Sequence, residues 1–297
     1  MSKKIIFSGC GTAIVTPFDN DNNKINYFEY QKLIEFQIAN NCDAIIVCGT
    51  TGESATLSMD EKKELIEFTV SIVKHRVPVI AGTGSNNTKT AIELTKFAEN
   101  VNCDGVLVVT PYYNKTTQNG LIEHYSAIAT ATSLPIILYN VPSRTGLNIE
   151  PETCLELSKI ENIVAIKEAS GNLSQIAKIA ALCNDSLNIY SGNDDQILPI
   201  LSIGGIGVIS VLANIYPNYV HNITESFFSN DLERARYLQL KAINLIGKLF
   251  SEVNPIPVKE ALNILDFKVG ATRLPLVQMS EGKREELIMV LENFVKE

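Results

Sequence analysis

The sequence predicts an α/β protein, a (β/α)8 TIM barrel followed by a C-terminal all-helical domain. Short apolar runs rich in β-branched residues alternate with longer amphipathic segments along most of the chain. The runs are continuously apolar, as expected for parallel strands that are covered on both faces. Eight such units within about 230 residues match the count of a closed barrel. An open doubly wound sheet, which usually has fewer units, is the alternative.

The expected strands are short, and they cover residues 11–16, 44–48, 79–82, 105–110, 135–140, 163–167, 187–191 and 207–210. Apolar residues recur at helical spacing in the segments between them, at 27–40, 59–75, 88–101, 121–132 and 173–182. Ser58 and Glu61 have the spacing of a capping box at the start of one helix. Pro151 suits the first turn of another helix.

The strand pattern stops after about residue 230, whereas helical spacing continues at 232–250, 257–265 and 281–295. We therefore expect a catalytic barrel at residues 1–230 and a helical domain at residues 231–297. A helical appendage of this kind ordinarily packs on the barrel or on a neighbouring subunit.

Composition and charge indicate which classes of partner and location to expect. The 297 residues are 45% hydrophobic and 20% charged, which is typical of a globular protein. The net charge of −8 disfavours nucleic acid as a partner, because phosphate binding requires clustered Lys and Arg. No run of about 18 apolar residues could span a membrane, and the first apolar run is too short for a signal peptide. The six scattered cysteines indicate reduced core residues, so we expect a cytoplasmic protein.

The apolar run at 163–167 ends in Lys167. In a (β/α)8 barrel the active site lies at the C-terminal ends of the strands. A lysine packed there loses water, which favours the neutral amine, and a neutral amine attacks carbonyl carbons to form a Schiff base. A solvated surface lysine is the alternative. Glu168 is expected to face the opposite side of the strand.

Hydroxyl groups follow three of the other expected strands. Tyr139 lies at the end of the fifth strand, Tyr113 follows the fourth, and Thr50 follows the second. A chain of hydroxyls can pass the protons that Schiff-base chemistry requires. The three histidines fall instead in helical patterns. Tyrosines that only pack against their neighbours are the alternative.

Two loops suggest a substrate with an acidic group. GTTGE at 49–53 offers small residues and backbone N–H groups that suit a small carboxylate or phosphate. Arg144 is the only arginine in the expected strand-end loops, and its planar guanidinium suits a carboxylate, although a structural salt bridge is equally compatible. No His, Asp or Glu cluster has metal-ligand spacing, which disfavours a metal-assisted aldolase. A Schiff base acts as its own electron sink, so we expect no separate cofactor.

Several motifs resemble one enzyme family over nearly the whole chain. They are GTTGES at 49–54, VTPYYNK at 109–115, LYNVPSRTG at 138–146, IKEASGN at 166–172, SGND at 191–194 and NPIPVK at 254–259. Together they resemble the pyruvate-dependent Schiff-base lyases, the family of 4-hydroxy-tetrahydrodipicolinate synthase (dihydrodipicolinate synthase) and N-acetylneuraminate lyase. The resemblance implies a (β/α)8 barrel with a C-terminal helical domain, usually assembled as a homotetramer of two tight dimers.

The resemblance also implies roles for the matched residues. Lys167 would hold pyruvate as a Schiff base, and Arg144 would bind the carboxylate of L-aspartate 4-semialdehyde. Thr50, Tyr113 and Tyr139 would relay protons, with Tyr113 reaching into the site of a neighbouring subunit. The residues expected to line the pyruvate site are Thr51, Gly192 and Ile209.

Within this family, Arg144 and the Thr50-Thr51 pair favour the enzyme of the diaminopimelate pathway to lysine. A lyase acting on N-acetylneuraminate or on a 2-keto-3-deoxy sugar acid is the alternative of the same class. A non-catalytic barrel that binds carboxylates is the alternative of another class.

The family's lysine-effector cleft is only partly matched. Its matching residues are Ser54, Ala55, Asn86 and Tyr112. Met59 and Lys62 stand where lysine-inhibited members typically carry histidines, and Thr90 stands where they carry glutamate. A cationic effector would lose its acidic partner and meet an extra cation, so we expect weak or absent inhibition by lysine.

Overall fold

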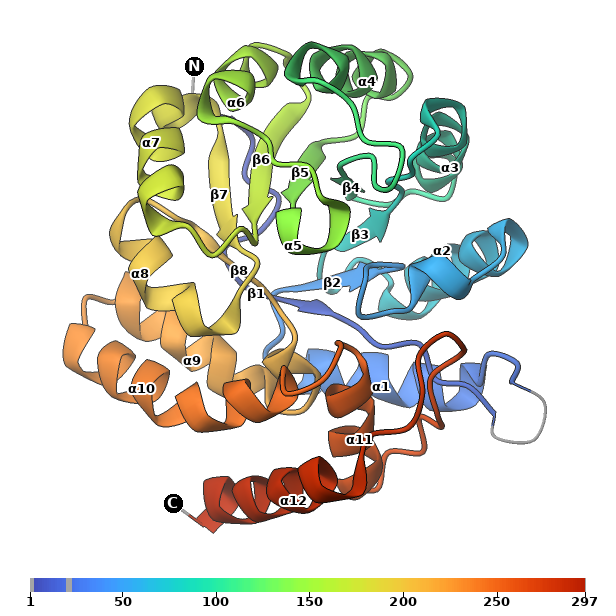
Figure 1. Ribbon diagram of the computed structural model, residues 1–297, viewed down its shortest axis with the longest axis vertical. Helices are drawn as coiled ribbons and strands as arrows, with labels where there is room; N and C mark the ends of the chain where they lie inside the picture. Colours follow the sequence, from blue (N-terminus) through green and yellow to red (C-terminus); the bar gives the residue numbers. More distant parts are fainter. Residues whose placement is uncertain (1–2, 20–22, 297) are drawn as a thin grey trace.

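The computed structural model describes residues 3–19 and 23–296. Its parallel strands close into one barrel in chain order, and β1 pairs with both β2 and β8 (Figure 1). The strands are β1 (Gly9–Ala13), β2 (Ala44–Val47), β3 (Val79–Gly82), β4 (Gly105–Val109), β5 (Ile136–Asn140), β6 (Ile163–Glu168), β7 (Asn188–Ser191) and β8 (Gly207–Ser210). This closure confirms the (β/α)8 barrel and excludes the open sheet.

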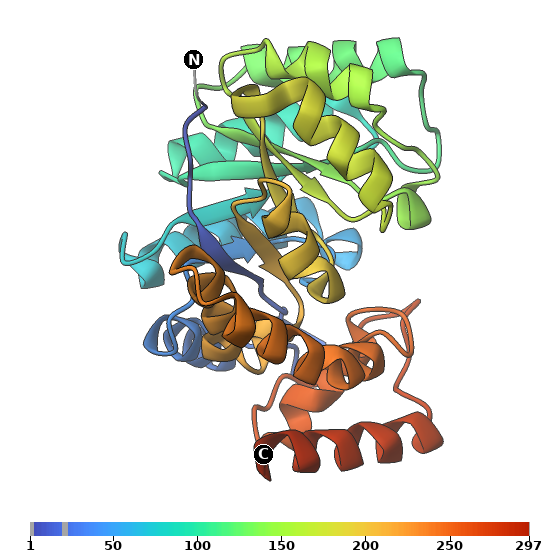
Figure 2. The same ribbon diagram turned by 90° about the vertical axis from the view of Figure 1, so that its left-hand side faces the viewer.

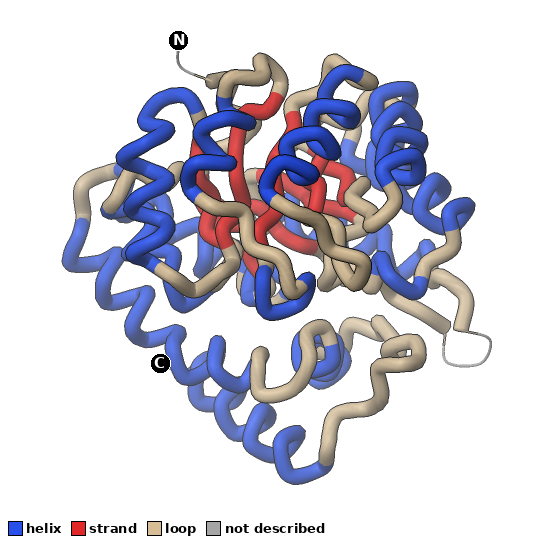
Figure 3. Tube along the Cα trace, turned by 45° about the horizontal axis from the view of Figure 1, so that its top comes forward, coloured by secondary structure: helices blue, strands red, loops and turns tan. Residues whose placement is uncertain are grey.

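Helices surround the strands on the outside of the barrel (Figure 3). They are α1 (Tyr27–Ala39), α2 (Met59–Val73), α3 (Thr88–Asn100), α4 (Gln118–Thr130), α6 (Pro151–Ser158), α7 (Leu173–Cys183), α8 (Ile197–Ser202) and α9 (Pro217–Phe228). The short helix α5 (Pro142–Thr145) lies instead at the C-terminal ends of β5 and β6 (Figure 1). The capping box of Ser58 and Glu61 is present at α2, and Pro151 occupies the first turn of α6. Local sequence signals therefore define these two helix starts.

Three helices follow the barrel: α10 (Leu232–Leu249), α11 (Ile256–Ile264) and α12 (Glu281–Lys296). α10 packs against α9 and α12, and α11 packs against α12. Figure 2 shows α11 and α12 at the end of the molecule opposite the N-terminus. All three expected C-terminal helices are present, whereas the division into two domains at residue 230 stays a prediction.

Two apolar clusters form the core. The inner cluster fills the barrel and includes Ile46, Leu107, Tyr139, Tyr190 and Ile209. The larger outer cluster lies between the strands and the surrounding helices. Strands with apolar side chains on both faces supply both clusters, which explains their continuously apolar sequence.

The first strand differs from its expected range of 11–16. It begins at Gly9 because Gly9 and Cys10 pair with β8 to close the barrel. It ends at Ala13, and the Val15 backbone N–H donates instead to the side chain of Asn214. The sequence pattern also left α8 and α9 without a prediction, and His75 lies in the turn after α2 rather than in a helix.

All six cysteines are buried and free, as the sequence predicts. In the described part of the chain, no helix has the length and apolar character needed to cross a membrane.

Candidate active site

The candidate site lies at the C-terminal ends of the strands, where β5 and β6 point toward α5 in Figure 1. Lys167 lies one residue before the end of β6, and only 6% of its surface is exposed. Parallel pairing places it beside Tyr139 of β5, with Nζ 4.5 Å from the centroid of the Tyr139 ring. No other described residue forms a hydrogen bond or ion pair with Nζ. Buried lysines are ordinarily paired, so this unpaired amine is a candidate nucleophile.

Gly192 has no side chain, and this absence makes room for the side chain of Lys167. A Cβ atom at Gly192 would lie 3.1 Å from Lys167 Cε and 2.6 Å from the Ala169 Cβ. The Gly192 N–H donates to the Glu168 carbonyl at 2.7 Å, which fixes this close approach. Ile209 is fully buried in the inner cluster together with Tyr139. The structure thus brings Gly192 next to Lys167 and places Ile209 in the inner cluster that also contains Tyr139.

Asp194 is a charged residue of this site that the sequence analysis did not single out. It is 1% exposed and accepts hydrogen bonds from Ser210 Oγ at 2.5 Å and from the N–H groups of Val211 and Leu212. Burial raises the pKa of the Asp194 carboxyl, while these hydrogen bonds and the charge of Lys167 oppose the rise. Its position after β7, at the end of the SGND motif, was the available signal.

Glu168 faces away from the barrel interior, as expected. The pairing of β5 with β6 places it beside Asn140, whose Nδ2 donates to Glu168 Oε1 at 2.5 Å. Ser170 donates to Oε2 from both its N–H and its hydroxyl, and Gln175 donates to Oε1. The side chain is fully buried, and burial raises the pKa of Glu168. The residues adjacent to Tyr139 and Lys167 are therefore bonded to each other outside the barrel.

A cavity of about 280 Å³ opens at this end of the barrel. Of the expected site residues, Thr50, Tyr139 and Arg144 line it. The hydroxyls of Thr50 and Tyr139 make no hydrogen bond to other described residues, so both are available to a ligand. Lys167 and Thr51 do not line the cavity themselves; Lys167 contacts Tyr139, which does.

The expected effector residues Ser54, Ala55 and Tyr112 line the same cavity, as does Lys62. Asn86 does not line it, and its carbonyl accepts a hydrogen bond from the Asn114 side chain. The candidate active site and most of the candidate effector cleft are therefore continuous in one chain.

Tyr113 does not reach Lys167 within one chain. Its side chain is 93% exposed, and its φ of 71° lies in the left-handed region, which is uncommon for a large residue. A strained, outward-pointing tyrosine at a strand-end loop is compatible with a role in another subunit.

Part of the cavity wall comes from the C-terminal segment rather than from the barrel loops. The residues that contribute are Val253, Asn254, Pro255, Pro275 and Leu276. The sequence analysis assigned none of them a role. The motif at 254–259 marked the segment, but an Asn-Pro pair gives no local signal that it faces a site built by distant strands.

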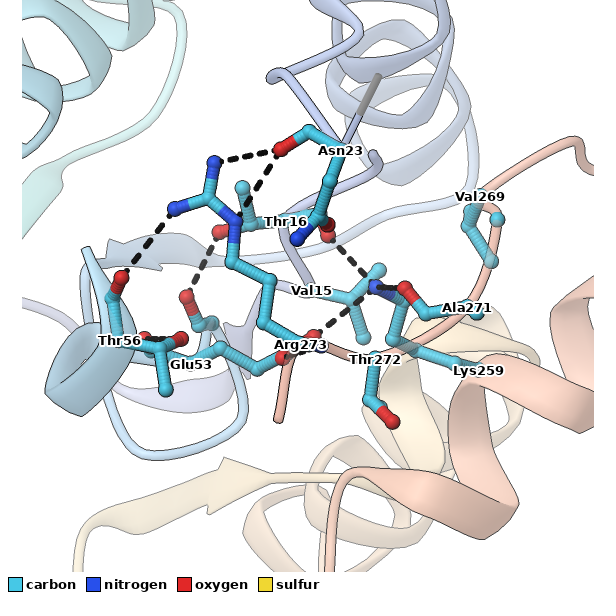
Figure 4. Close-up of polar contacts among 12 residues, drawn as sticks. Val15, Thr16, Asn23, Glu53, Thr56, Lys259, Val269, Ala271, Thr272 and Arg273 are labelled. Atoms are coloured by element: carbon cyan, nitrogen blue, oxygen red, sulfur yellow. Dashed lines mark hydrogen bonds and ion pairs between the residues drawn. The ribbon is translucent and has the colours of Figure 1, made fainter. Parts of the chain in front are cut away.

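A buried cluster joins this segment to the loop that carries Thr50 and Thr51 (Figure 4). Glu53 has a left-handed φ of 54°, and its carboxylate accepts from Lys259 Nζ at 2.9 Å and from the Arg273 N–H at 2.8 Å. Lys259 also donates to the carbonyls of Thr16 and Ala271. The Lys259 and Glu53 side chains are 2% and 0% exposed.

Arg273 extends this cluster toward α2. Its guanidinium lies 4.2 Å from the centroid of the Phe18 ring and donates to both carboxylate oxygens of Glu61. Burial lowers the pKa of Lys259, and the charge of Glu53 opposes that change. The GTTGE loop is thus held by charged groups of the C-terminal segment.

No three His, Cys, Asp or Glu residues within the described ranges are grouped so that they could hold a metal ion.

Three comparisons with known proteins find the same family. A model of the dihydrodipicolinate synthetase family matches residues 6–294. The chain is 56% identical to the 4-hydroxy-tetrahydrodipicolinate synthase of Clostridium perfringens, covering 97% of both chains. It is similar to the lysine-bound dihydrodipicolinate synthase of Cyanidioschyzon merolae (TM-score 0.94, 42% identity, 98% and 99% coverage). It is also similar to a monomeric variant of a dihydrodipicolinate synthase (TM-score 0.95, 44% identity, 97% of both chains).

Proposed function

The chain belongs to the dihydrodipicolinate synthetase family, and we propose that it condenses pyruvate with L-aspartate 4-semialdehyde. This is the reaction of 4-hydroxy-tetrahydrodipicolinate synthase, a lyase of the diaminopimelate pathway to lysine. The observation that carries the proposal is the buried, unpaired amine of Lys167 beside Tyr139 at the C-terminal end of a barrel strand.

The reaction begins at Lys167. Its neutral amine attacks the keto carbon of pyruvate, and loss of water gives an imine. The imine withdraws electrons, so a methyl proton is lost and an enamine forms. The enamine carbon adds to the aldehyde of the second substrate. The amine of that substrate then attacks the imine carbon, which closes the ring and releases Lys167.

Each of these steps moves a proton. Thr50 and Tyr139 supply hydroxyls in the cavity, and Tyr113 of a neighbouring subunit completes the relay. Hydroxyl groups can both donate and accept protons, so the relay needs no histidine.

The substrates are held by their carboxylates. Arg144 binds the carboxylate of L-aspartate 4-semialdehyde through its planar guanidinium. Thr51, Gly192 and Ile209 line the pyruvate site. The closeness of Gly192 to Lys167 and the presence of Ile209 in the cluster of Tyr139 support this assignment. The loop after β2 and the loop after β5 thus each bind one anionic group.

The larger organisation is also part of the proposal. Residues 1–230 form the catalytic barrel and residues 231–297 the helical domain. The assembly is a homotetramer of tight dimers in which the Tyr113 side chain enters a neighbouring site, and the exposure and left-handed φ of Tyr113 support its contact with another subunit. The free, buried cysteines support a cytoplasmic location, because the cytoplasm keeps thiols reduced.

Borohydride trapping tests the proposal directly. The protein is incubated with pyruvate and sodium borohydride, and the peptide that contains Lys167 is analysed by mass spectrometry. We expect one reduced pyruvate adduct on Lys167 and loss of both labelling and activity in Lys167→Ala. The control is Lys178→Ala, which removes an exposed lysine of α7 and should retain both.

Absence of an adduct on Lys167 would exclude every Schiff-base mechanism, including those of the sugar-acid lyases. An adduct without turnover of L-aspartate 4-semialdehyde would refute the assignment of the second substrate. Parallel assays with N-acetylneuraminate and 2-keto-3-deoxy sugar acids then identify the reaction.

A further inference from the structure

Asn254 contacts residues of both proposed carboxylate sites. It lies just before α11, is 6% exposed and lines the cavity. Its side-chain Nδ2 donates to Thr51 Oγ1 at 3.0 Å, and its backbone carbonyl accepts from Arg144 Nη2 at 3.3 Å. Thr51 follows β2 and Arg144 follows β5, so a residue outside the barrel joins the two loops.

The contact with Thr51 determines what the Thr51 hydroxyl can do. A hydroxyl has one proton to donate and two lone pairs that accept. Because Asn254 Nδ2 donates to Oγ1, one lone pair is occupied and the hydroxyl proton is directed elsewhere. No other described residue bonds to this hydroxyl, so its proton has no acceptor among the described residues.

The other end of the same carboxamide indicates that the arrangement is functional. Asn254 Oδ1 is buried and has no hydrogen-bond partner among the described residues. A buried acceptor without a partner is destabilising, and native proteins rarely tolerate one without a reason. Holding Thr51 in one hydrogen-bonding role is such a reason.

The two partners belong to segments that are already joined. The loop of Thr51 continues into Glu53, which is bound by Lys259 and by the Arg273 N–H. Lys259 lies on α11, the helix that begins two residues after Asn254. The ion pair therefore holds Asn254 and Thr51 at a fixed separation.

We propose that Asn254 is a positioning residue that fixes the Thr51 hydroxyl as a hydrogen-bond donor to the pyruvate carboxylate. The inference rests on the proposed function, and it adds a residue of the C-terminal segment to the pyruvate site. Asn254 acts through Thr51 and does not itself contact the reacting atoms.

The test measures the pyruvate concentration that gives half-maximal borohydride labelling of Lys167, without the second substrate. For Asn254→Ala we expect this concentration to rise about 10-fold, with a much smaller fall in the maximal labelling rate. For Asn254→Asp we expect a larger rise, because a carboxylate accepts from Thr51 and reverses its hydroxyl. Asn244→Ala, which removes an exposed asparagine of α10, should not change either value.

The Thr51→Ala background separates positioning from a general structural effect. There, Asn254→Ala should change the half-saturating concentration by less than about twofold, because the two residues act through one contact. In the same Thr51→Ala background, the effect of Asn254→Asp on the half-saturating concentration measures the introduced charge alone, because that charge acts whether or not Thr51 is present. Equal effects of Asn254→Ala in both backgrounds would overturn the proposal.

Normal pyruvate binding by Asn254→Asp would overturn the proposal as well. A carboxylate can only accept from the Thr51 hydroxyl, so Asn254 would then act as an acceptor for Thr51 and not as its donor. These outcomes are distinct from failure of the proposed function. In that case the unsubstituted protein itself would show no adduct on Lys167.

Discussion

Two buried glutamates lie beside the candidate site and are stabilised in different ways. Glu168 follows Lys167 and is fully buried, and among the described residues its hydrogen-bond donors are the neutral groups of Asn140, Ser170 and Gln175. Glu53 follows the Thr50-Thr51 pair and accepts from the Lys259 ammonium at 2.9 Å. Burial is nearly the same at the two positions, whereas the charge of the donors differs.

The difference reflects what each glutamate joins. Glu168 joins β6 to its neighbour β5, and parallel pairing already places the two strands together. Neutral donors suffice there. Glu53 joins the β2 loop to α11, across 206 residues of sequence. An ion pair with three further carbonyl and N–H contacts supplies the directional contact that strand pairing cannot provide there.

The largest expected effect comes from breaking the buried ion pair between Lys259 and Glu53. Lys259→Met leaves the Glu53 carboxylate buried without its cation, which costs about 3–5 kcal/mol of unfolding free energy. Urea denaturation measures this loss. Lys248→Met, which breaks the exposed pair with Glu286, is the matched control and should cost at most about 1 kcal/mol.

Removing both charges sharpens this result. The double variant Glu53→Gln with Lys259→Met contains no unpaired buried charge and should be more stable than Lys259→Met alone. If the Lys259→Met and Lys248→Met variants lose the same stability, the buried pair does not hold the C-terminal segment.

A smaller effect is expected at Glu168, whose hydrogen-bond donors are neutral. Glu168→Gln places an amide donor where Asn140, Ser170 and Gln175 also donate, and we expect a loss of about 1–3 kcal/mol. The pH dependence is diagnostic. Because burial raises the pKa of Glu168, the folded protein binds this proton more tightly than the unfolded chain. The contribution to stability is fully present below the ordinary glutamate pKa of about 4.3 and is lost as pH rises through the raised value.

Urea denaturation of both proteins from pH 4 to about pH 8 checks this sign. The stability advantage of the unsubstituted protein over Glu168→Gln should shrink as the pH rises. Glu225→Gln, at an exposed position of α9, should show no such trend. An advantage that grows with pH would mean that the buried group is held as a carboxylate at all these pH values.

The smallest expected effect concerns inhibition by lysine at the candidate effector cleft, which lies next to Glu53. Lys62 lines the cavity with Ser54 and Ala55, and a lysine effector would meet this cation without an acidic partner at Thr90. Millimolar lysine should therefore leave steady-state activity nearly unchanged. The double variant Lys62→His with Thr90→Glu should gain sensitivity. Strong inhibition of the unsubstituted protein would refute this prediction.

The sequence by itself determined the features that depend on neighbouring residues. Apolar runs and helical spacing gave the order of strands and helices, because side-chain periodicity is local. The Ser58 capping box and Pro151 gave two helix starts in the same way. The residues at strand ends, including Lys167 and Tyr139, could also be identified, since a parallel barrel places all such ends on one face.

Only the tertiary structure decided which distant groups meet. Closure with β8 set the start of β1, and strand pairing placed Lys167 against the Tyr139 ring. The contact between Asn254 and Thr51 spans 203 residues, and no local pattern could have indicated it. Such contacts depend on how whole elements pack, because the chain brings remote side chains together only after the barrel and the C-terminal helices are in place.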